Sequence, residues 1–132
     1  MSYDNYIAGG FGIVGAFLSW FLGELDGVVK LLIVMAVIDQ ISGLIKAGVT
    51  HKWSSDAGFH GIAKKVLMFM LVGVANIIDH EILGGHSEVL RDAVSLFYVA
   101  NEGLSIIENS IDIGAPVPEA LKERFATWHN KQ

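Results

Sequence analysis

Residues 28–45 read VVKLLIVMAVIDQISGLI, a run in which Lys30 and Asp39 carry the only charges. Eleven of these residues are Val, Leu or Ile. On a membrane-insertion scale, these eleven contribute roughly −3 to −7 kcal/mol, whereas one central acid costs about +3 kcal/mol. The apolar side chains outweigh Asp39, so the run predicts a membrane-spanning helix that carries one acid.

A second apolar run, nearer the N-terminus, also has membrane length. No charged residue lies between Asp4 and Glu24. A helix of about 20 residues spans the roughly 30 Å hydrocarbon core of a bilayer, so we expect a span at about residues 7–25. Nothing basic precedes the run beyond the amino terminus itself, which argues against a signal peptide.

The third apolar segment, residues 61–83, has a shorter uncharged core at residues 66–78. It spans a bilayer only if Lys64 and Lys65 extend to one interface while Asp79 lies at the other. We expect this arrangement, with a polar linker before the segment.

The fourth segment, residues 90–111, is the most polar. Its apolar residues contribute roughly −3 to −5 kcal/mol, and Glu102 and Glu108 could cost as much if both were central. Such a helix is marginal alone in lipid, so we expect it to span together with partner helices. The alternative is an interfacial helix whose acids lie in water.

The distribution of basic residues favours four spans with both termini, including the tail at residues 114–132, in the cytoplasm. In that topology seven of the nine Lys and Arg residues are cytoplasmic, whereas Lys30 and Arg91 lie outside. The seven are Lys46, Lys52, Lys64, Lys65, Lys122, Arg124 and Lys131. We therefore predict an all-α, multi-pass protein forming one membrane domain over residues 1–132. A soluble bundle is the alternative, but the first two segments lack a polar face.

Composition excludes several functional classes. The chain of 132 residues is 52% apolar and 17% charged, with a net charge of −5 and no cysteine. A disordered chain, a disulfide scaffold, a Cys-ligated metal site and a general nucleic-acid binder are all disfavoured. His80-Glu81 lacks the second histidine of a zinc-protease motif, because position 84 is Gly. We expect no catalytic residues, no metal and no cofactor.

Small residues recur at four-residue spacing in the first segment. Such stripes allow close approach of helix backbones in lipid. They serve either self-association or packing on the protein's own helices. The two stripes comprise Ala8, Gly12 and Ala16, and Gly15, Ser19 and Gly23.

The fourth segment carries a polar stripe. Asn101, Ser105 and Glu108 recur at helical spacing, and Glu102 and Asn109 flank them. Acids at membrane depth normally face a bundle interior or a water-filled cavity. The companion of this stripe is expected to be Asp39. We predict that these six residues either line a pore in an oligomer or form interhelical hydrogen bonds.

After residues 114–118, whose two prolines stop the fourth segment, a short amphipathic helix is expected. Leu121, Phe125 and Trp128 recur on one face of it. This helix could lie on the membrane, dock on a partner or pack on its own loops.

Four motifs occur in a specific order along the chain. They are DQISGLIKA at 39–47, GIAKK at 61–65, NEGLSIIEN at 101–109 and GAPVP at 114–118. In this order they resemble the toxin-secretion and phage-lysis holin family, over about residues 30–125. The resemblance rests mainly on the long third motif.

The resemblance implies a small multi-pass protein of the bacterial cytoplasmic membrane. Its partners would be further copies of itself and the lipid bilayer, and its lesions would release an endolysin or a toxin. The resemblance implies no catalytic residues. The competing hypotheses are a membrane adaptor or antiholin-like regulator that acts through its tail, and a small ion-conducting channel that uses Asp39 and Glu102.

Overall fold

The computed structural model describes the backbone of residues 2–131, together with their side chains other than those of Trp128 and His129. The helices are α1 (Tyr3–Leu22), α2 (Gly27–Thr50), α3 (Ser55–Ile77), the π-helical turn η1 (Ile78–Ile82), α4 (Val89–Ile113) and α5 (Glu119–His129). The described part of the chain contains no β-strand, which confirms the all-α prediction.

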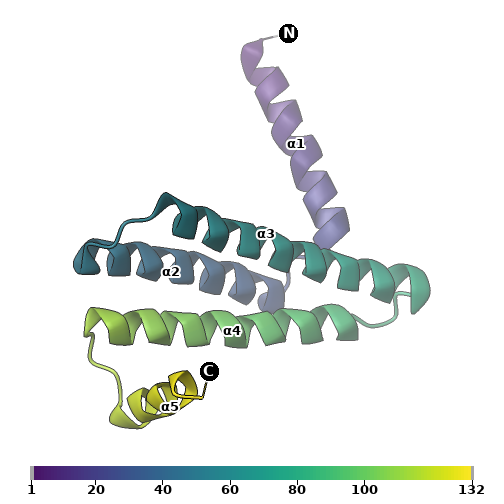
Figure 1. The fold of residues 1–132 in the computed structure, drawn as a ribbon. Coiled ribbons are helices and arrows are strands. Elements are labelled where there is room, and N and C mark those ends of the chain that lie inside the picture. The colour runs from purple at the N-terminus through teal and green to yellow at the C-terminus, as the bar shows by residue number, and fades with distance from the viewer. Residues whose placement is uncertain (1, 132) are drawn as a thin grey trace.

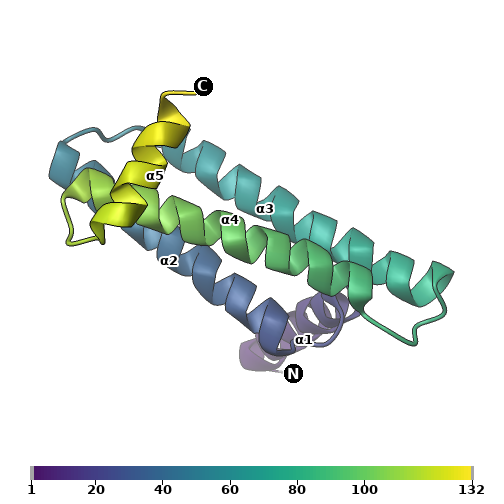
Figure 2. The same ribbon diagram turned by 90° about the horizontal axis from the view of Figure 1, so that it is seen from below.

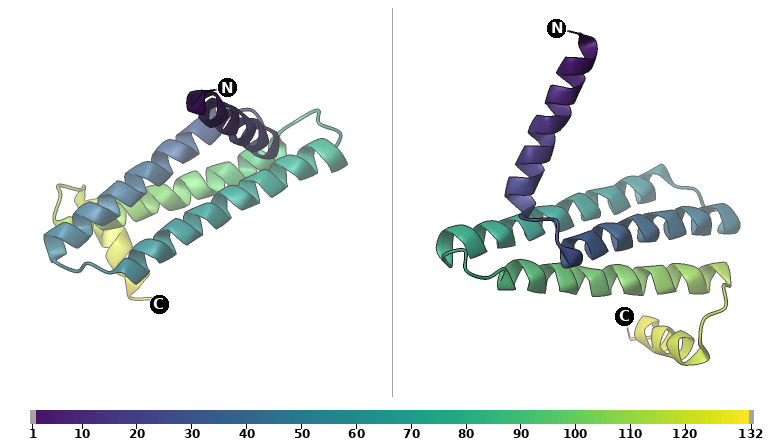
Figure 3. Two further views of the ribbon diagram at one scale, coloured as in Figure 1. Left: turned by 90° about the horizontal axis from the view of Figure 1, so that it is seen from above. Right: turned by 180° about the vertical axis from the view of Figure 1, so that it is seen from behind.

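Helices α2, α3 and α4 lie side by side as a three-helix bundle (Figures 1 and 2). The chain reverses after α2 and again after η1, so α2 and α4 run in the same direction and α3 runs against both. The closest packing is between α2 and α4, whereas α3 packs mainly on α4 and hardly on α2. Helix α1 projects away from the bundle at a steep inclination (Figure 3).

Local sequence signals set most helix ends. The Asp26 side chain accepts a hydrogen bond from the Val29 N–H at 3.2 Å and so caps the start of α2. Gly23, with φ of 79°, and Gly114, with φ of 84°, end α1 and α4 in backbone conformations that favour glycine. Because of Gly23, α1 ends at Leu22 rather than near residue 25 as expected.

The polar linker expected before the third segment, at residues 51–60, is partly helical. The Ser54 hydroxyl accepts a hydrogen bond from the Ala57 N–H at 3.2 Å, so α3 begins at Ser55. At its other end, α3 continues into η1, where the Leu83 N–H reaches the Ile78 carbonyl at 3.0 Å. Together α3 and η1 are longer than the predicted segment.

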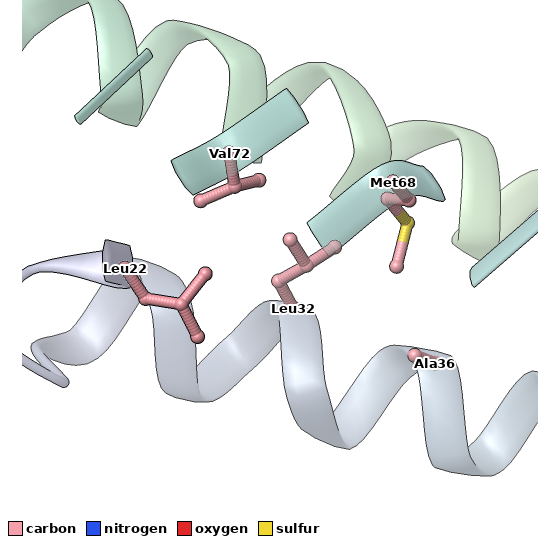
Figure 4. Close-up of a cluster of buried hydrophobic side chains, with 5 residues drawn as sticks. All are labelled: Leu22, Leu32, Ala36, Met68 and Val72. Carbon is pink, nitrogen blue, oxygen red and sulfur yellow. The ribbon is translucent and has the colours of Figure 1, made fainter. Parts of the chain in front are cut away.

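The buried apolar core is small. Leu22, Leu32 and Ala36 meet Met68 and Val72 of α3 (Figure 4). Most other large apolar side chains of α1, α2 and α3 are exposed. An apolar surface of this extent is unfavourable in water and suits a lipid environment.

Three helices are long and apolar enough to cross a membrane: α1, α2 and the continuous helix Ser55–Ile82. Helix α4 is not among them, because its central stretch carries the polar residues Asn101, Glu102, Glu108 and Asn109 and is less apolar than the other three helices. The structure therefore supports three of the four predicted spans. Membrane crossing by α4 stays a prediction.

Candidate functional site

An ion cluster joins the three helices of the bundle. The Lys65 ammonium lies 2.5 Å from Asp39 Oδ2 and 2.8 Å from Glu102 Oε2. The three side chains are only 17%, 13% and 8% exposed, respectively. One cation thus bridges two carboxylates, one from α2 and one from α4.

Hydrogen bonds extend this cluster along the α2–α4 seam. Asn109 Nδ2 donates to Asp39 Oδ1 at 3.3 Å and to the Ser42 hydroxyl at 2.9 Å. Further toward the end of the bundle, Lys46 and Asp112 form a half-exposed ion pair at 2.5 Å. The polar contacts explain how α2 and α4 pack closely although both carry polar residues.

The ion cluster lies deep along the helices. Asp39 is twelve residues from the start of α2 and eleven from its end, or about 18 Å and 16 Å at 1.5 Å per residue. Glu102 lies equally near the middle of α4. If these helices cross a bilayer, the cluster lies within the hydrocarbon core and not at its edge.

A groove between α3 and α4 leads to the ion cluster. It has a volume of about 560 Å³, and Asn101, Ser105 and Glu108 line its α4 side. Arg124 and Phe125 of α5 lie at its rim. The polar stripe predicted from the sequence therefore faces a hollow that α5 partly covers.

A second polar cluster lies where α1, α2, η1 and α4 meet. The Arg91 side chain is fully buried; it pairs with Asp26, with Glu88 at 2.5 Å and with Asp92 at 3.2 Å. It also donates to the Glu24 carbonyl at 3.0 Å. A buried guanidinium is stable only when its donors are satisfied in this way.

Two acids around Arg91 have distinct roles. Asp79 accepts hydrogen bonds from the Leu90 and Arg91 N–H groups, at 3.2 Å and 2.8 Å, and so caps α4. Partial burial alone would raise the pKa of Asp26, but the Val29 N–H and the Arg91 guanidinium together hold that pKa below its ordinary value.

The end of α1 is fastened to this second cluster. Asn76 Nδ2 donates to the Trp20 and Phe21 carbonyls at 3.3 Å and 3.1 Å. A side chain at Gly23 would overlap Asn76 and approach Arg91 Nη1 to 2.8 Å. Gly23 therefore lies at the end of α1, packed closely against Asn76 and Arg91, and its role in packing between helices stays a prediction.

The sequence profile of the Bacteriophage holin family matches residues 16–130. The chain belongs to this family. An uncharacterized protein of Listeria monocytogenes is 48% identical, over 92% of this chain and 86% of its own length. A probable holin of Bacillus phage phi105 is 43% identical, over 72% of this chain and 69% of its own length. No solved structure matches the chain.

The structure of this holin brings together four of the six polar residues singled out in the sequence. Asp39, Glu102 and Asn109 belong to the ion cluster and its hydrogen bonds, and Ser105 lies beside Asp39. Asn101 and Glu108 line the groove instead, and Glu108 makes a contact within the chain. Their role in a pore stays a prediction.

Sequence reasoning missed the central cation of this holin. Asp39 and Glu102 hold the Lys65 ammonium inside the bundle, whereas the sequence led us to expect this side chain to extend to a membrane interface. Asp79, also expected at an interface, is fully buried as the cap of α4. The sequence did contain a signal for this pairing. Asp39 and Glu102 are acids without a partner in two of the membrane segments, so they require a cation from a third segment.

Three other features of the holin are the small residues of α1, a group of carboxylates near Arg91, and the apolar face of α5. Added Cβ atoms at Gly12 and Gly15 would meet nothing within 4 Å, so the structure shows no packing of these positions on the chain itself. Three carboxylates, from Asp26, Glu88 and Asp92, lie close enough together to hold a metal ion, but Arg91 pairs with all three. The Trp128 side chain, expected on the apolar face of α5, lies outside the described residues.

Proposed function

We propose that this holin assembles into homo-oligomers in the bacterial cytoplasmic membrane and opens lesions that release an endolysin or a toxin. The single observation that carries the proposal is the ion cluster of Asp39, Lys65 and Glu102 midway along α2 and α4. Charged groups at such depth are costly in lipid unless they are paired or face water. In this structure the three charged groups are paired with one another, which suits a state of the protein that does not conduct.

Buried apolar side chains separate the two polar clusters on two of the bundle's helices. Along α2 and α3, the apolar residues Leu32, Met68 and Val72 lie between the cluster around Lys65 and the one around Arg91. In an assembly that separates α3 from α4, the polar stripe of α4 would face water and line the lesion.

Lateral association would use α1. Almost all of this helix is exposed apart from its last turn, and its small residues Gly12 and Gly15 are open to a neighbouring helix. The topology proposed for this assembly has four spans, including α4, with both termini in the cytoplasm. No enzymatic step is part of the mechanism.

The decisive experiment is induced expression in bacteria with and without a co-expressed cytosolic cell-wall hydrolase. Turbidity, viability and membrane potential are followed over time. A holin gives an abrupt, delayed loss of turbidity only when the hydrolase is present. Depolarisation without hydrolase release would instead favour a small ion channel.

Two variants test the role of the polar stripe. Glu102→Gln and Glu108→Gln should shift the time of lysis at matched expression, whereas Glu123→Gln on the exposed side of α5 serves as the control. Membrane insertion should be the same in all three. Unchanged timing in both groove variants would refute the proposed role of the stripe.

A truncation separates the holin from the adaptor hypothesis. Deletion of residues 119–132 removes α5, which packs only weakly on the other helices. A holin should still permeabilise the membrane, with altered timing at most. Complete loss of the phenotype, with the protein present in the membrane, would favour an adaptor that acts through its tail.

A further inference from the structure

The face of α4 that the single chain buries most deeply is polar along nearly the whole helix. The three most buried residues of α4, Arg91, Ser95 and Glu102, are all polar. Successive residues of a helix are about 100° apart, so three further polar residues lie within about 40° of the same direction. In that arc only Ile113, at the end of α4, is apolar. We call the six polar residues the buried polar line: Arg91, Ser95, Tyr98, Glu102, Ser105 and Asn109.

The adjoining face of α4 is polar along only part of its length. It carries Asn101 and Glu108 of the polar stripe, which are about 10 Å apart along the helix. Toward the start of α4 the same face continues as Leu90, Val94 and Phe97, which line a separate apolar hollow of about 440 Å³. A lesion lined by this face alone would therefore be apolar over much of the roughly 30 Å hydrocarbon core.

The buried polar line has the length that a lesion requires. Arg91 and Asn109 are 18 residues apart, or about 27 Å along the helix, which is close to the thickness of the hydrocarbon core. Between residues 93 and 100, Ser95 and Tyr98 are the only polar residues. At that depth, no other face of α4 can offer a polar group to water.

The bundle satisfies both ends of this line but not its middle. Arg91 and Glu102 form ion pairs, and Asn109 donates a hydrogen bond to Asp39 Oδ1. The Ser95 hydroxyl is fully buried, yet it has no hydrogen-bond partner in the described part of the chain. A buried polar group without a partner is unfavourable and rare in proteins. Water in an open lesion would supply the missing partner.

We propose that α4 lines the lesion with the buried polar line, including Ser95 and Tyr98, and that α4 leaves both α2 and α3 to expose it. Glu102 is paired with Lys65 of α3, and Asn109 is bonded to Asp39 of α2, so separation from α3 alone would leave the line covered. This inference rests on the proposed function and deepens it, because it extends the lining to the half of α4 that the polar stripe does not reach.

The test is cysteine labelling of the full-length chain, which contains no cysteine of its own. Ser95→Cys, Tyr98→Cys and Phe97→Cys are expressed in bacteria without a hydrolase, and the opening of lesions is timed by loss of membrane potential. A membrane-impermeant methanethiosulfonate with a trimethylammonium group is added before or after opening. The labelled fraction is measured by mass spectrometry of the purified protein.

The reagent reports on water because it reacts with the thiolate, which an apolar environment disfavours. After opening, Ser95→Cys and Tyr98→Cys should react about tenfold faster or more than before it. Phe97→Cys, the matched control on the adjoining apolar face, should stay unreactive. Ser105→Cys lies on both faces, so it should react under either arrangement and marks an open lesion.

Two labelling results would overturn the proposal. In the first, Phe97→Cys reacts after opening and Ser95→Cys does not, which would assign the lining to the adjoining face. In the second, Ser105→Cys reacts while Ser95→Cys and Tyr98→Cys both stay unreactive, which would limit the lining to one half of α4. Ser95→Cys exchanges only an oxygen atom for sulfur, and Tyr98→Cys reports independently on the same half of the helix.

Failure of this inference is distinct from failure of the proposed function. Release of a co-expressed hydrolase by the cysteine-free chain is recorded in parallel. Release, with Ser95→Cys and Tyr98→Cys unlabelled, would refute the buried polar line as the lining and leave the holin function intact. No release from the cysteine-free chain would refute the proposed function, and this inference with it.

Discussion

Replacing Lys65 by glutamine removes the only cation of the ion cluster. The two carboxylates of Asp39 and Glu102, both within 2.8 Å of the ammonium, then lie together with no opposite charge. Glu102→Gln has a different result, because it leaves Asp39 and Lys65 as a neutral pair. The structure therefore predicts that loss of the lysine is far more damaging than loss of either acid.

The magnitude follows from burial. All three side chains are less than one-fifth exposed, and breaking such a pair by removing one partner costs about 3–5 kcal/mol. We expect a loss of this order for Lys65→Gln. For Glu102→Gln we expect about 1 kcal/mol, the net value of an ordinary hydrogen bond.

The assay is reversible unfolding in mixed micelles, followed by circular dichroism. Lys52→Gln, on the exposed turn before α3, is the control for loss of a positive charge. In the double variant Lys65→Gln/Glu102→Gln, one carboxylate of the cluster is also neutralised, so part of the stability should return. Equal destabilisation by Lys65→Gln and Glu102→Gln, or no recovery in the double variant, would refute the bridging role of the lysine.

Three further predictions concern other contacts. Gly73→Ala would force a methyl group into the Phe21 ring and should cost about 1–3 kcal/mol, detected by the same unfolding assay and by faster proteolysis of α1. Because the folded-state pKa of Asp26 is lowered, Asp26 stabilises the fold above its ordinary pKa of 3.8, and this stabilisation is lost as the pH falls through the lowered value. The free energy of unfolding, measured between about pH 2 and 6, should show this loss. The variant Asp26→Asn should flatten that pH profile. Ser54→Ala removes the cap of α3 and should cost about 1 kcal/mol of unfolding free energy.

The apolar segments could be predicted from the sequence because insertion into lipid depends on local composition. The runs around residues 7–25 and 28–45 could be predicted as membrane-spanning helices without knowing which helices they pack against. The polar face of α4 was equally accessible, since helical spacing alone places Asn101, Ser105 and Glu108 together. These features are properties of single helices.

Apart from the expected meeting of Asp39 with the polar face of α4, pairing between helices could not be predicted in the same way. Arg91 and Asp26 are 65 residues apart, and their contact depends on how α2 and α4 are rotated about their axes. The partners of Lys65 were equally hard to predict. Because this residue adjoins an apolar run, its side chain could also be expected to extend to the membrane interface. The hydrophobic pattern limits these rotations only loosely, because much of the surface of α2 and α3 is apolar all round.

The steep inclination of α1 to the bundle (Figure 3) has a mechanical consequence. A flat bilayer has a single normal. In this arrangement, the axes of α1 and of the bundle cannot both be parallel to that normal. Helix α1 is about 30 Å long, and Asn76 holds its last turn through hydrogen bonds to the Trp20 and Phe21 carbonyls. Any realignment of this helix by surrounding lipid or by a neighbouring copy applies torque at that turn, where Arg91 links it to α2 and α4.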